Sequence, residues 1–433
     1  AADRRCPADT AAPHSTPGGV LSVVLLLALV FARRLLFFVI LSLLAVTMAA
    51  TAAQAEMGPT ATSGVRDSLT ALSNWFWNEN VWLPPGTTWA HIKDTSKVNY
   101  AQIEQLYYSF YVALALLVVR WVAERCVFKP VGRWFGLRPR PSRPMVSSDK
   151  DRLLEQAFRS GQRGQTGSQH KPPADEVSKV APLVGWPERD VERWWRQRAR
   201  VDKPTSLDKF SESAWRCSYY AAVFVYGCWC LSDKPWLWDT MHCWYDFPHH
   251  NMTPDVWWYY MIELGFYISL TFSQFLDVKR KDFWQMFVHH IVTIMLMAFS
   301  WTCNLTRIGT LVMLLHDFAD VPLEAAKMAK YVKKQKAADV LFVVFTLSWL
   351  VSRLGLYPYR IIYSTAYQAT FVIEMFAAYY IFNSLLLALQ VLHIIWTVFI
   401  VKIVIQALTS PGVSTIKDLR SEDESSTSDE KED

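Results

Sequence analysis

The sequence predicts an all-α protein, a polytopic bundle of about seven membrane-spanning helices that carries a small polar insert. Hydrophobic residues make up 52% of the 433 residues and aromatic residues 14%, with 20 tryptophans, which is high for a water-soluble chain. The apolar residues are concentrated in runs close to the 20 residues or so that cross a bilayer. Charged residues still make up 19%, so part of the chain must face water.

Residues 1–56 form an N-terminal extension with two interpretations. An arginine pair at 33–34 precedes an apolar run that ends in small residues, which is the layout of a signal peptide. The segment fits equally well as sequence that precedes a start of translation at Met48 or Met57. We base no function on it.

Residues 57–130 contain an aromatic lead-in and the first span. Four tryptophans lie between residues 75 and 89, and tryptophan favours the headgroup layer of a membrane, so we expect this stretch on the lumenal membrane surface. Residues 107–123 are the first convincing span, and basic residues follow it directly.

Residues 137–203 are polar, and we expect a small helical insert there. The segment VERWWRQRAR (residues 191–200) resembles the third helix of a homeodomain, with Trp194 and Trp195 as core anchors before a basic tail. Gln197 stands where a homeodomain has its adenine-reading Asn, Ala199 replaces a phosphate-contacting Arg, and Pro182 falls within the second helix. These departures argue against DNA binding, and we expect a three-helix homeodomain-like module on the cytosolic face.

Six further apolar runs belong to a transmembrane region at residues 210–408. Five of them cover approximately residues 219–231, 257–275, 308–321, 340–356 and 371–405, and the fourth span of the protein begins at residue 283. Basic residues cluster after the first, third and fifth spans and at the end of the seventh, and the intervening loops are poor in them. The positive-inside rule then places the insert and the acidic tail, residues 409–433, in the cytosol.

Ionisable residues accumulate at membrane depth in the fourth and fifth spans. Such residues cost about 2.5–3.5 kcal/mol each near a helix centre, so their presence indicates function. His289 and His290 lie in the first turns of the fourth span, whereas His249 and His250, in a proline-flanked loop, are expected to be solvated or interfacial. The polar residues of the fifth span and its approach are Arg307, His316, Asp317, Asp320 and Glu324.

Helical spacing places these groups around one cavity. Asp317 and Asp320 are three residues apart on one face of the fifth span, and adjacent residues such as His289 and His290 point about 100° apart. A carboxylate that accepts a ring N–H fixes the histidine tautomer and makes the other nitrogen more basic. The arrangement suits proton abstraction or attack by imidazole on an activated acyl group.

This region resembles the Lag1p motif of the animal ceramide synthases, in the TRAM-LAG1-CLN8 (TLC) family of membrane proteins. The motif residues are His289-His290, Asn304, Arg307, Gly309, Leu311-Val312, His316-Asp317, Asp320, Leu323-Glu324, Ala326-Lys327-Met328 and Tyr331. The resemblance extends to DKPW (residues 233–236), YYMIEL (259–264) and DVKRKDF (277–283), and to the homeobox-like insert between the first two spans.

The resemblance implies transfer of a fatty acyl group from acyl-CoA to the amine of a sphingoid base, which gives ceramide, in the endoplasmic reticulum membrane. It implies His289, His290, Asp317 and Asp320 as catalytic residues and Asn304, Arg307, His316 and Glu324 as substrate-binding residues. We expect Asp317 and Asp320 to orient the imidazoles, and Arg307 to pair with a carboxylate or a phosphate.

The family resemblance also gives expectations about partners. Acyl-CoA is a co-substrate, no cofactor or metal is expected, and the protein is expected to act as a homodimer or as a heterodimer with other ceramide synthases. The loop between the last two spans, about residues 356–370, is associated with acyl-chain choice.

Three other functions compete with this one. His289, His290, His316, Asp317 and Asp320 could ligate iron or zinc, although membrane di-iron enzymes need more histidine clusters. A non-enzymatic sphingolipid transporter or sensor would bind substrate without turnover. A membrane-tethered transcription regulator would need a cleavage linker, and none is evident.

Overall fold

The computed structural model describes residues 71–139, 149–163, 174–202, 204–277 and 282–409, and every regular element in those ranges is a helix. The all-α fold class predicted from the sequence is therefore confirmed. Three predictions concern residues outside the described ranges: the signal-like segment 1–56, the acidic tail from residue 410 onward, and the basic run at 278–281.

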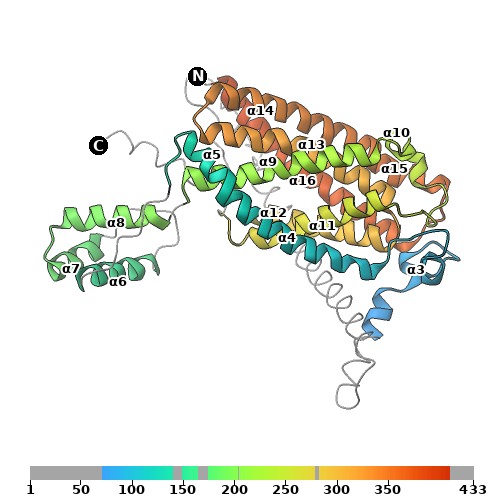
Figure 1. Ribbon diagram of the computed structural model, residues 1–433, viewed down its shortest axis with the longest axis horizontal. Coiled ribbons are helices and arrows are strands. Elements are labelled where there is room, and N and C mark those ends of the chain that lie inside the picture. The colour runs from blue at the N-terminus through green and yellow to red at the C-terminus, as the bar shows by residue number, and fades with distance from the viewer. Residues whose placement is uncertain (1–70, 140–148, 164–173, 203, 278–281, 410–433) are drawn as a thin grey trace, which may run out of the picture. The chain divides into compact units, whose positions relative to one another are not determined.

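Seven long helices form the bundle (Figure 1). They are α4 (Tyr107–Ala123), α9 (Ser206–Leu231), α11 (Pro254–Ser273), α12 (Phe283–Thr302), α13 (Thr306–Tyr331), α14 (Gln335–Trp349) and α16 (Ala377–Thr409). Four helical runs of the described residues are long and apolar enough to cross a membrane: Ile103–Trp134, Phe283–Thr302, Gln335–Phe371 and Ala377–Thr409. Helices α9, α11 and α13 have sufficient length but are more polar, so the count of seven spans stays a prediction.

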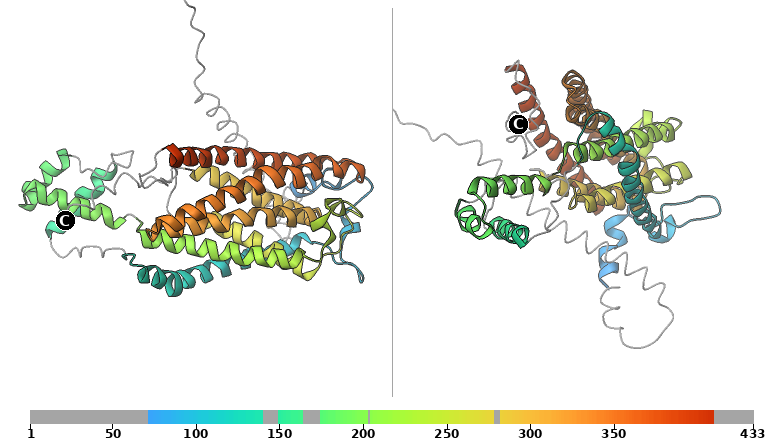
Figure 2. Two further views of the ribbon diagram at one scale, coloured as in Figure 1. Left: turned by 90° about the horizontal axis from the view of Figure 1, so that it is seen from above. Right: turned by 60° about the vertical axis from the view of Figure 1, so that its left-hand side comes forward.

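Helix α13 lies at the centre of the bundle. It contacts α9, α11, α12 and α14, and these helices run side by side in both views (Figures 1 and 2). The ionisable residues in its sequence explain this central position. The side chains of His316, Asp317 and Glu324 are each at most 5% exposed. Polar side chains in a membrane face other helices, where they can find hydrogen-bonding partners.

At one end of the bundle, polar side chains tie the connections between helices together. We call this the loop end, where α9 ends, α11 begins and α12 joins α13. Arg360 donates to the carbonyl of Leu237 at 2.6 Å, and the Trp244 indole N–H donates to Ser364 at 2.9 Å. These bonds join the 232–253 segment, which includes α10 (Pro235–Trp238) and η4 (Thr240–Cys243), to the helices after α14.

The histidine pair in this segment is only partly as expected. His249 is exposed, as predicted, but His250 is 2% exposed and its Nε2 lies 2.9 Å from the carbonyl of Tyr245. Burial lowers the pKa of His250 to about 4, so the ring is neutral at pH 7 and donates to that carbonyl. The prediction that both rings are solvated or interfacial is wrong for His250, because the segment that carries this ring buries it.

At the opposite end, an ion-pair network joins three helices. We call this the basic end, where α4, α11 and α13 end. Asp277, which follows α11, accepts from Arg120 of α4 at 2.7 Å and from Arg216 of α9 at 3.1 Å. Arg216 also pairs with Glu212 one turn earlier at 2.9 Å. The side chains are less than 20% exposed, so the network ties the three helices together where single surface pairs would not.

The connection before α16 differs from the prediction. Residues 356–370 were expected to be a loop, but the chain stays helical through the π-helical stretch η5 (Leu350–Ile362), α15 (Tyr363–Ala366) and η6 (Gln368–Phe371). The π-helix accommodates Gly355 and Pro358, because its wider turn moves the backbone bonds to i→i+5. The true connection is residues 372–376.

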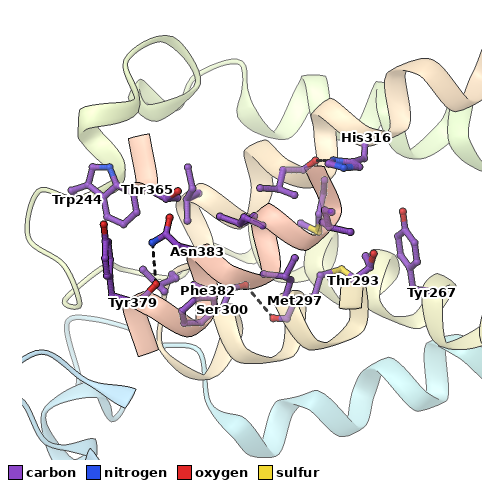
Figure 3. A pocket seen from close by; sticks show the side chains of 18 of the residues that line it. Trp244, Tyr267, Thr293, Met297, Ser300, His316, Thr365, Tyr379, Phe382 and Asn383 are labelled. Atoms are coloured by element: carbon purple, nitrogen blue, oxygen red, sulfur yellow. Dashed lines mark hydrogen bonds between the residues drawn. The ribbon is translucent and has the colours of Figure 1, made fainter. Parts of the chain in front are cut away.

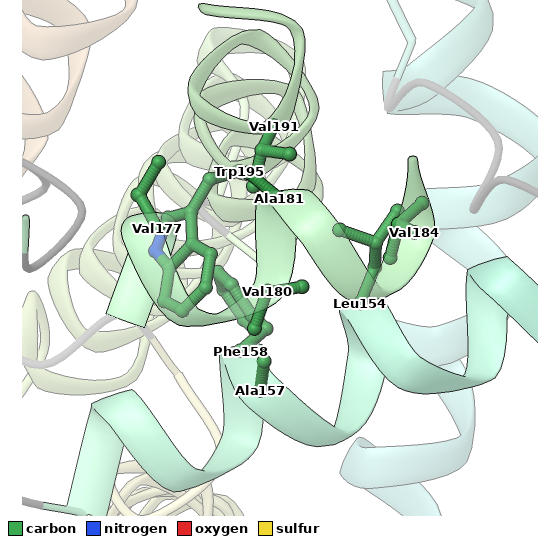
Figure 4. Close-up of a cluster of buried hydrophobic side chains, with 9 residues drawn as sticks. All are labelled: Leu154, Ala157, Phe158, Val177, Val180, Ala181, Val184, Val191 and Trp195. Carbon is green, nitrogen blue, oxygen red and sulfur yellow. The ribbon is translucent and has the colours of Figure 1, made fainter. Parts of the chain in front are cut away.

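The polar insert contains three helices, α6 (Asp149–Arg163), α7 (Ala174–Val184) and α8 (Glu188–Asp202), around one small core (Figure 4). Phe158 and Trp195 meet there, with ring centroids 5.2 Å apart, and Pro182 is accommodated near the end of α7. Arg198 stacks over Phe158 and donates to Glu155 at 2.7 Å, and this hydrogen bond lowers the pKa of Glu155. Arg198, within the basic tail, thus stabilises the packing of the insert.

Candidate active site

A largely apolar cavity lies between the helices of the bundle (Figure 3), and its empty space of about 860 Å³ includes space open to solvent. Its walls are formed by α12, α13 and α16, and the segments around Trp244, Thr365 and Phe376 close the loop end. Most lining side chains are aliphatic or aromatic: Leu296, Met297, Leu305, Ile308, Val312, Met313, Ile373, Phe376, Phe382, Leu386 and Leu389.

Polar groups gather at the two ends of this cavity. His316 and Asp317 of α13 and Tyr267 of α11 mark the end that faces the basic end of the bundle. Figure 3 shows His316 and Tyr267 on that side, and Trp244 and Tyr379 on the other. The cavity is therefore bounded by polar groups at both ends, and its lining histidine and aspartate lie at one of them.

His289 and His290 lie one turn before Thr293, a residue of the cavity wall, on α12. The Tyr267 ring contacts both imidazoles, with centroid distances of 6.1 Å to each. The rings then diverge, as their spacing predicts. His289 faces α16 and packs edge-on against Trp396, whereas His290 Nδ1 lies 3.0 Å from the amide oxygen of Gln274.

The tautomer of His290 follows from this contact. An amide oxygen can only accept, so His290 donates through Nδ1 and the neutral ring carries its lone pair on Nε2. Such a lone pair suits a base or a nucleophile. The expected orienting carboxylate is not the partner here, because His290 points toward α11 and meets an amide instead.

The two aspartates of α13 occupy different surroundings. Asp317 is 1% exposed, borders the cavity and lies beside the buried carboxyl group of Glu263 on α11. Asp320 lies one turn further on and is 3.5 Å from Arg353 of η5. Asp317 is therefore the carboxyl group that can reach a substrate in the cavity.

Arg353 holds the polar part of α13 in place. It is 3% exposed and donates to the carbonyls of Leu315 and His316, at 3.1 and 2.7 Å, as well as pairing with Asp320. The guanidinium also lies over the Trp349 ring, 5.2 Å from its centroid. Five donors in a planar fork allow one arginine to serve several acceptors at once.

His316 is bonded at both ring nitrogens. Its Nδ1 lies 2.6 Å from the carbonyl of Val312, and its Nε2 lies 3.2 Å from Nε2 of His393 on α16. The ring of His316 therefore contributes to the cavity wall with neither nitrogen open to a substrate. Its predicted role in substrate binding would have to act through His393.

Three of the predicted substrate-binding residues lie away from the imidazoles. Asn304, with a positive φ of 56°, donates to the carbonyls of Pro248 and His250 at the loop end, roughly 20 Å along α12 from His290. Arg307 donates to the carbonyl of His242 and stacks on Trp236, also at the loop end. Glu324 pairs with Lys327 at 2.6 Å toward the basic end.

Residues outside the motif complete the site. Glu263, Arg353 and His393 are each at most 3% exposed and contact or adjoin motif residues from α11, η5 and α16. The signal that could have identified them is the one used for the motif, an ionisable side chain at membrane depth. Among the described residues, no three His, Cys, Asp or Glu side chains lie close enough together to hold a metal ion.

Comparison with known proteins identifies the class to which this bundle and its polar centre belong. Residues 209–402 match the family model described as the TLC domain. The chain is also 39% identical over 363 residues to human ceramide synthase 5, across 84% of this chain and 90% of the relative. Human ceramide synthase 4 is 36% identical over 365 residues, 84% of this chain and 89% of the relative.

The similarity reaches beyond mammals. Ceramide synthase hyl-1 of Caenorhabditis elegans is 32% identical over 362 residues, which cover 81% of this chain and 84% of that protein. The chain therefore belongs to the ceramide synthase family, as the sequence motif predicted, and its function is that of a membrane-bound acyltransferase of this family. The transporter and sensor alternatives are not favoured.

Gly309 tests how tightly the cavity wall is packed. A Cβ atom there would overlap the hydroxyl of Tyr260, which is fully buried and bonds to Ser300 at 2.9 Å. We expect Gly309→Ala to destabilise the protein by about 1–3 kcal/mol, because the ring cannot move aside. Thermal unfolding in detergent measures the effect.

Gly355→Ala is the matched control. The nearest atom to a Cβ at that position is the carbonyl oxygen of Leu350, at 3.8 Å, so the substitution meets no overlap. We expect unchanged or slightly higher stability there. Equal unfolding temperatures for the two variants would show that the contact between Tyr260 and Gly309 is not tight.

Proposed function

We propose that this protein transfers a fatty acyl group from acyl-CoA to the amine of a sphingoid base, and so acts as a sphingosine N-acyltransferase. The observation that carries the proposal is the apolar cavity that ends at His316 and Asp317, with His289 and His290 one helical turn from its wall residue Thr293. An acyl chain needs an apolar cavity, and amide formation needs a base that takes a proton from the attacking amine. Membership of the ceramide synthase family supports the same reaction.

In this reaction the amine nitrogen bonds to the thioester carbon, and the bond from that carbon to sulfur breaks. The sphingoid base arrives as an ammonium ion, which must lose a proton before it can attack. The nitrogen loses a second proton when the amide forms. The departing CoA sulfur takes up one of these two protons and leaves as a thiol. One imidazole accepts a proton or carries the acyl group in transit, and Asp317 holds the amine beside it. We propose that no further cofactor takes part.

The membrane orientation follows from charge. The basic end carries Arg120, Arg216, Lys327 and the lysines that follow α13, so we propose that it faces the cytosol. This orientation places the insert in the cytosol and the imidazoles toward it, in the endoplasmic reticulum membrane. Acyl-CoA then enters from the cytosolic side and its chain extends toward the loop end.

The sequon at Asn251 tests this orientation. Asn251 is exposed in the loop-end segment, and the proposed topology puts that segment in the lumen, where it can be glycosylated. We expect one glycan on the protein expressed in cells, seen as a mobility shift that glycosidase removes and Asn251→Gln abolishes. A glycan acceptor engineered into the insert should stay unmodified, and modification there would reverse the orientation.

Amide formation tests the reaction itself. Microsomes that contain the chain, supplied with labelled sphinganine and acyl-CoAs of several lengths, should form labelled N-acyl product. We expect His289→Ala and Asp317→Asn to lower turnover by about 100-fold or more, because each removes a group at the reacting centre. Phe318→Leu, beside Asp317 on the exposed face of α13, should retain activity.

A labelled acyl-CoA supplied without amine then separates the two histidines. An adduct on His289 or His290, detected by mass spectrometry, would identify the nucleophile and leave the other ring as the base. Absence of any amide product from well-expressed unaltered protein would contradict the proposed reaction.

The far wall of the cavity should limit acyl-chain length. Phe376, in the connection 372–376, is 6% exposed and lines the loop end together with Trp244. We expect Phe376→Ala to favour longer acyl-CoAs. Each methylene that gains apolar space contributes about 0.8 kcal/mol, so the kcat/KM ratio for chains that differ by two carbons should change about tenfold.

Tyr367→Leu is the control for that change. Tyr367 lies in the same region but is 52% exposed and is not part of the cavity wall, so its substitution should leave the chain-length profile unaltered. A profile that changes with Tyr367 and not with Phe376 would place the length limit outside the cavity.

A further inference from the structure

Helix α16 carries a polar face directly beyond the apolar wall of the cavity. Leu386 and Leu389 line the cavity, and Gln390, His393 and Trp396 follow on the same side of the helix at intervals of three residues. Residues three and four apart share one face of an α-helix. The wall therefore changes from apolar to polar at the level where His289 and His316 lie on the facing helices.

Each of these three side chains has a buried polar atom without a hydrogen-bond partner among the described residues. The atoms are Oε1 of Gln390, Nδ1 of His393 and Nε1 of Trp396. His393 is 1% exposed and Trp396 is 7% exposed. An unsatisfied buried polar atom costs about 1–3 kcal/mol, and three on one helical face indicate a ligand that satisfies them.

The protonation of His393 follows from its neighbours. The carbonyl of Val312 can only accept, so His316 donates to it through Nδ1 and, as a neutral ring, offers its lone pair at Nε2. The Nε2 of His393, 3.2 Å away, must then carry the hydrogen. The Nδ1 of His393 is left as an open acceptor.

The surroundings hold this face rigidly against the candidate active site. The Trp396 ring lies 5.3 Å from the His289 ring between centroids, and the His393 ring lies 5.1 Å from the His316 ring. Tyr357 packs edge-on against His393 from η5, with centroids 5.0 Å apart. Aromatic packing fixes both side chains, so their open atoms are held in position before a ligand arrives.

We propose that Gln390, His393 and Trp396 bind the amino and hydroxyl groups at the head of the sphingoid base. This inference rests on the proposed function and identifies where its second substrate is held. Gln390 and His393 accept hydrogen bonds from the amine or a hydroxyl group, and the Trp396 N–H donates to a hydroxyl oxygen.

The balance of donors and acceptors distinguishes this ligand from the other substrate. A thioester carbonyl has only acceptor atoms, so it could use the indole N–H but would leave the two acceptors of the face unsatisfied. An amino alcohol supplies both donors and acceptors. The face also adjoins His289, which brings the bound amine to the reacting carbon.

Kinetics with each substrate varied in turn test the proposal. We expect Trp396→Phe, which keeps the ring and removes the N–H, to raise the KM for sphinganine about three- to tenfold, the effect of one hydrogen bond. His393→Gln should do the same, because glutamine retains a donor toward His316 and lacks the Nδ1 acceptor. The KM for acyl-CoA should stay unchanged in both, which also shows that each variant folds.

Substrate analogues provide a second measurement. The unaltered protein should use sphinganine analogues that lack the hydroxyl group on carbon 1 or carbon 3 less well than sphinganine. A variant that lacks the protein partner of one of these hydroxyl groups should use sphinganine and the analogue without that hydroxyl group almost equally well. Ile394→Leu on the exposed face of α16 and Trp258→Phe on the exposed face of α11 are matched controls, and both should behave as the unaltered protein does.

The outcomes separate the two proposals. If the unaltered protein forms no amide, the proposed function and this inference both fall. If it forms amide but the variants change only the KM for acyl-CoA, or neither KM, the sphingoid base is held elsewhere and only this inference is overturned. Full discrimination among the analogues in both variants would overturn it as well.

Discussion

The contacts of Arg353 are the constraint on which the rest of the site depends. A lone guanidinium inside a membrane bundle is costly, and this one is stabilised by two backbone carbonyls of α13, the carboxylate of Asp320 and the face of Trp349. These partners fix η5 against α13 at the turn that presents His316 and Asp317. The same turn sets how far the cavity extends toward the basic end, so substrate geometry and helix packing are determined together.

The site separates two kinds of chemistry by depth. Apolar side chains from α12, α13 and α16 line the cavity, and the ionisable groups form one layer at its end. The cavity wall is therefore mostly hydrocarbon, and the histidine and aspartate side chains that can transfer protons lie at its end toward the basic end. An amphipathic substrate is oriented by this arrangement before any specific hydrogen bond forms.

The sequence predicted the helices and the depth of the polar residues, because long apolar runs and helical spacing are local properties. It did not predict the partners. His290 contacts Gln274, which is 16 residues away in sequence, and His316 contacts His393, which is 77 residues away. The loop that the family resemblance implied at 356–370 was wrong, because the chain stays helical there and accommodates Gly355 and Pro358 in a π-helical stretch. Asn304 and Arg307 belong to the motif, yet they brace the loop end.

The π-helical stretch between α14 and α15 has an evolutionary consequence. Because its hydrogen bonds already span one residue more than those of an α-helix, it can gain or lose a residue without interrupting the helical path. A change after Arg353 would rotate the part of the chain that follows, including Thr365 and Phe376. Arg353 itself would keep its hydrogen bonds to α13. A single-residue insertion or deletion in this stretch could therefore alter the far wall of the cavity and preserve the reacting centre.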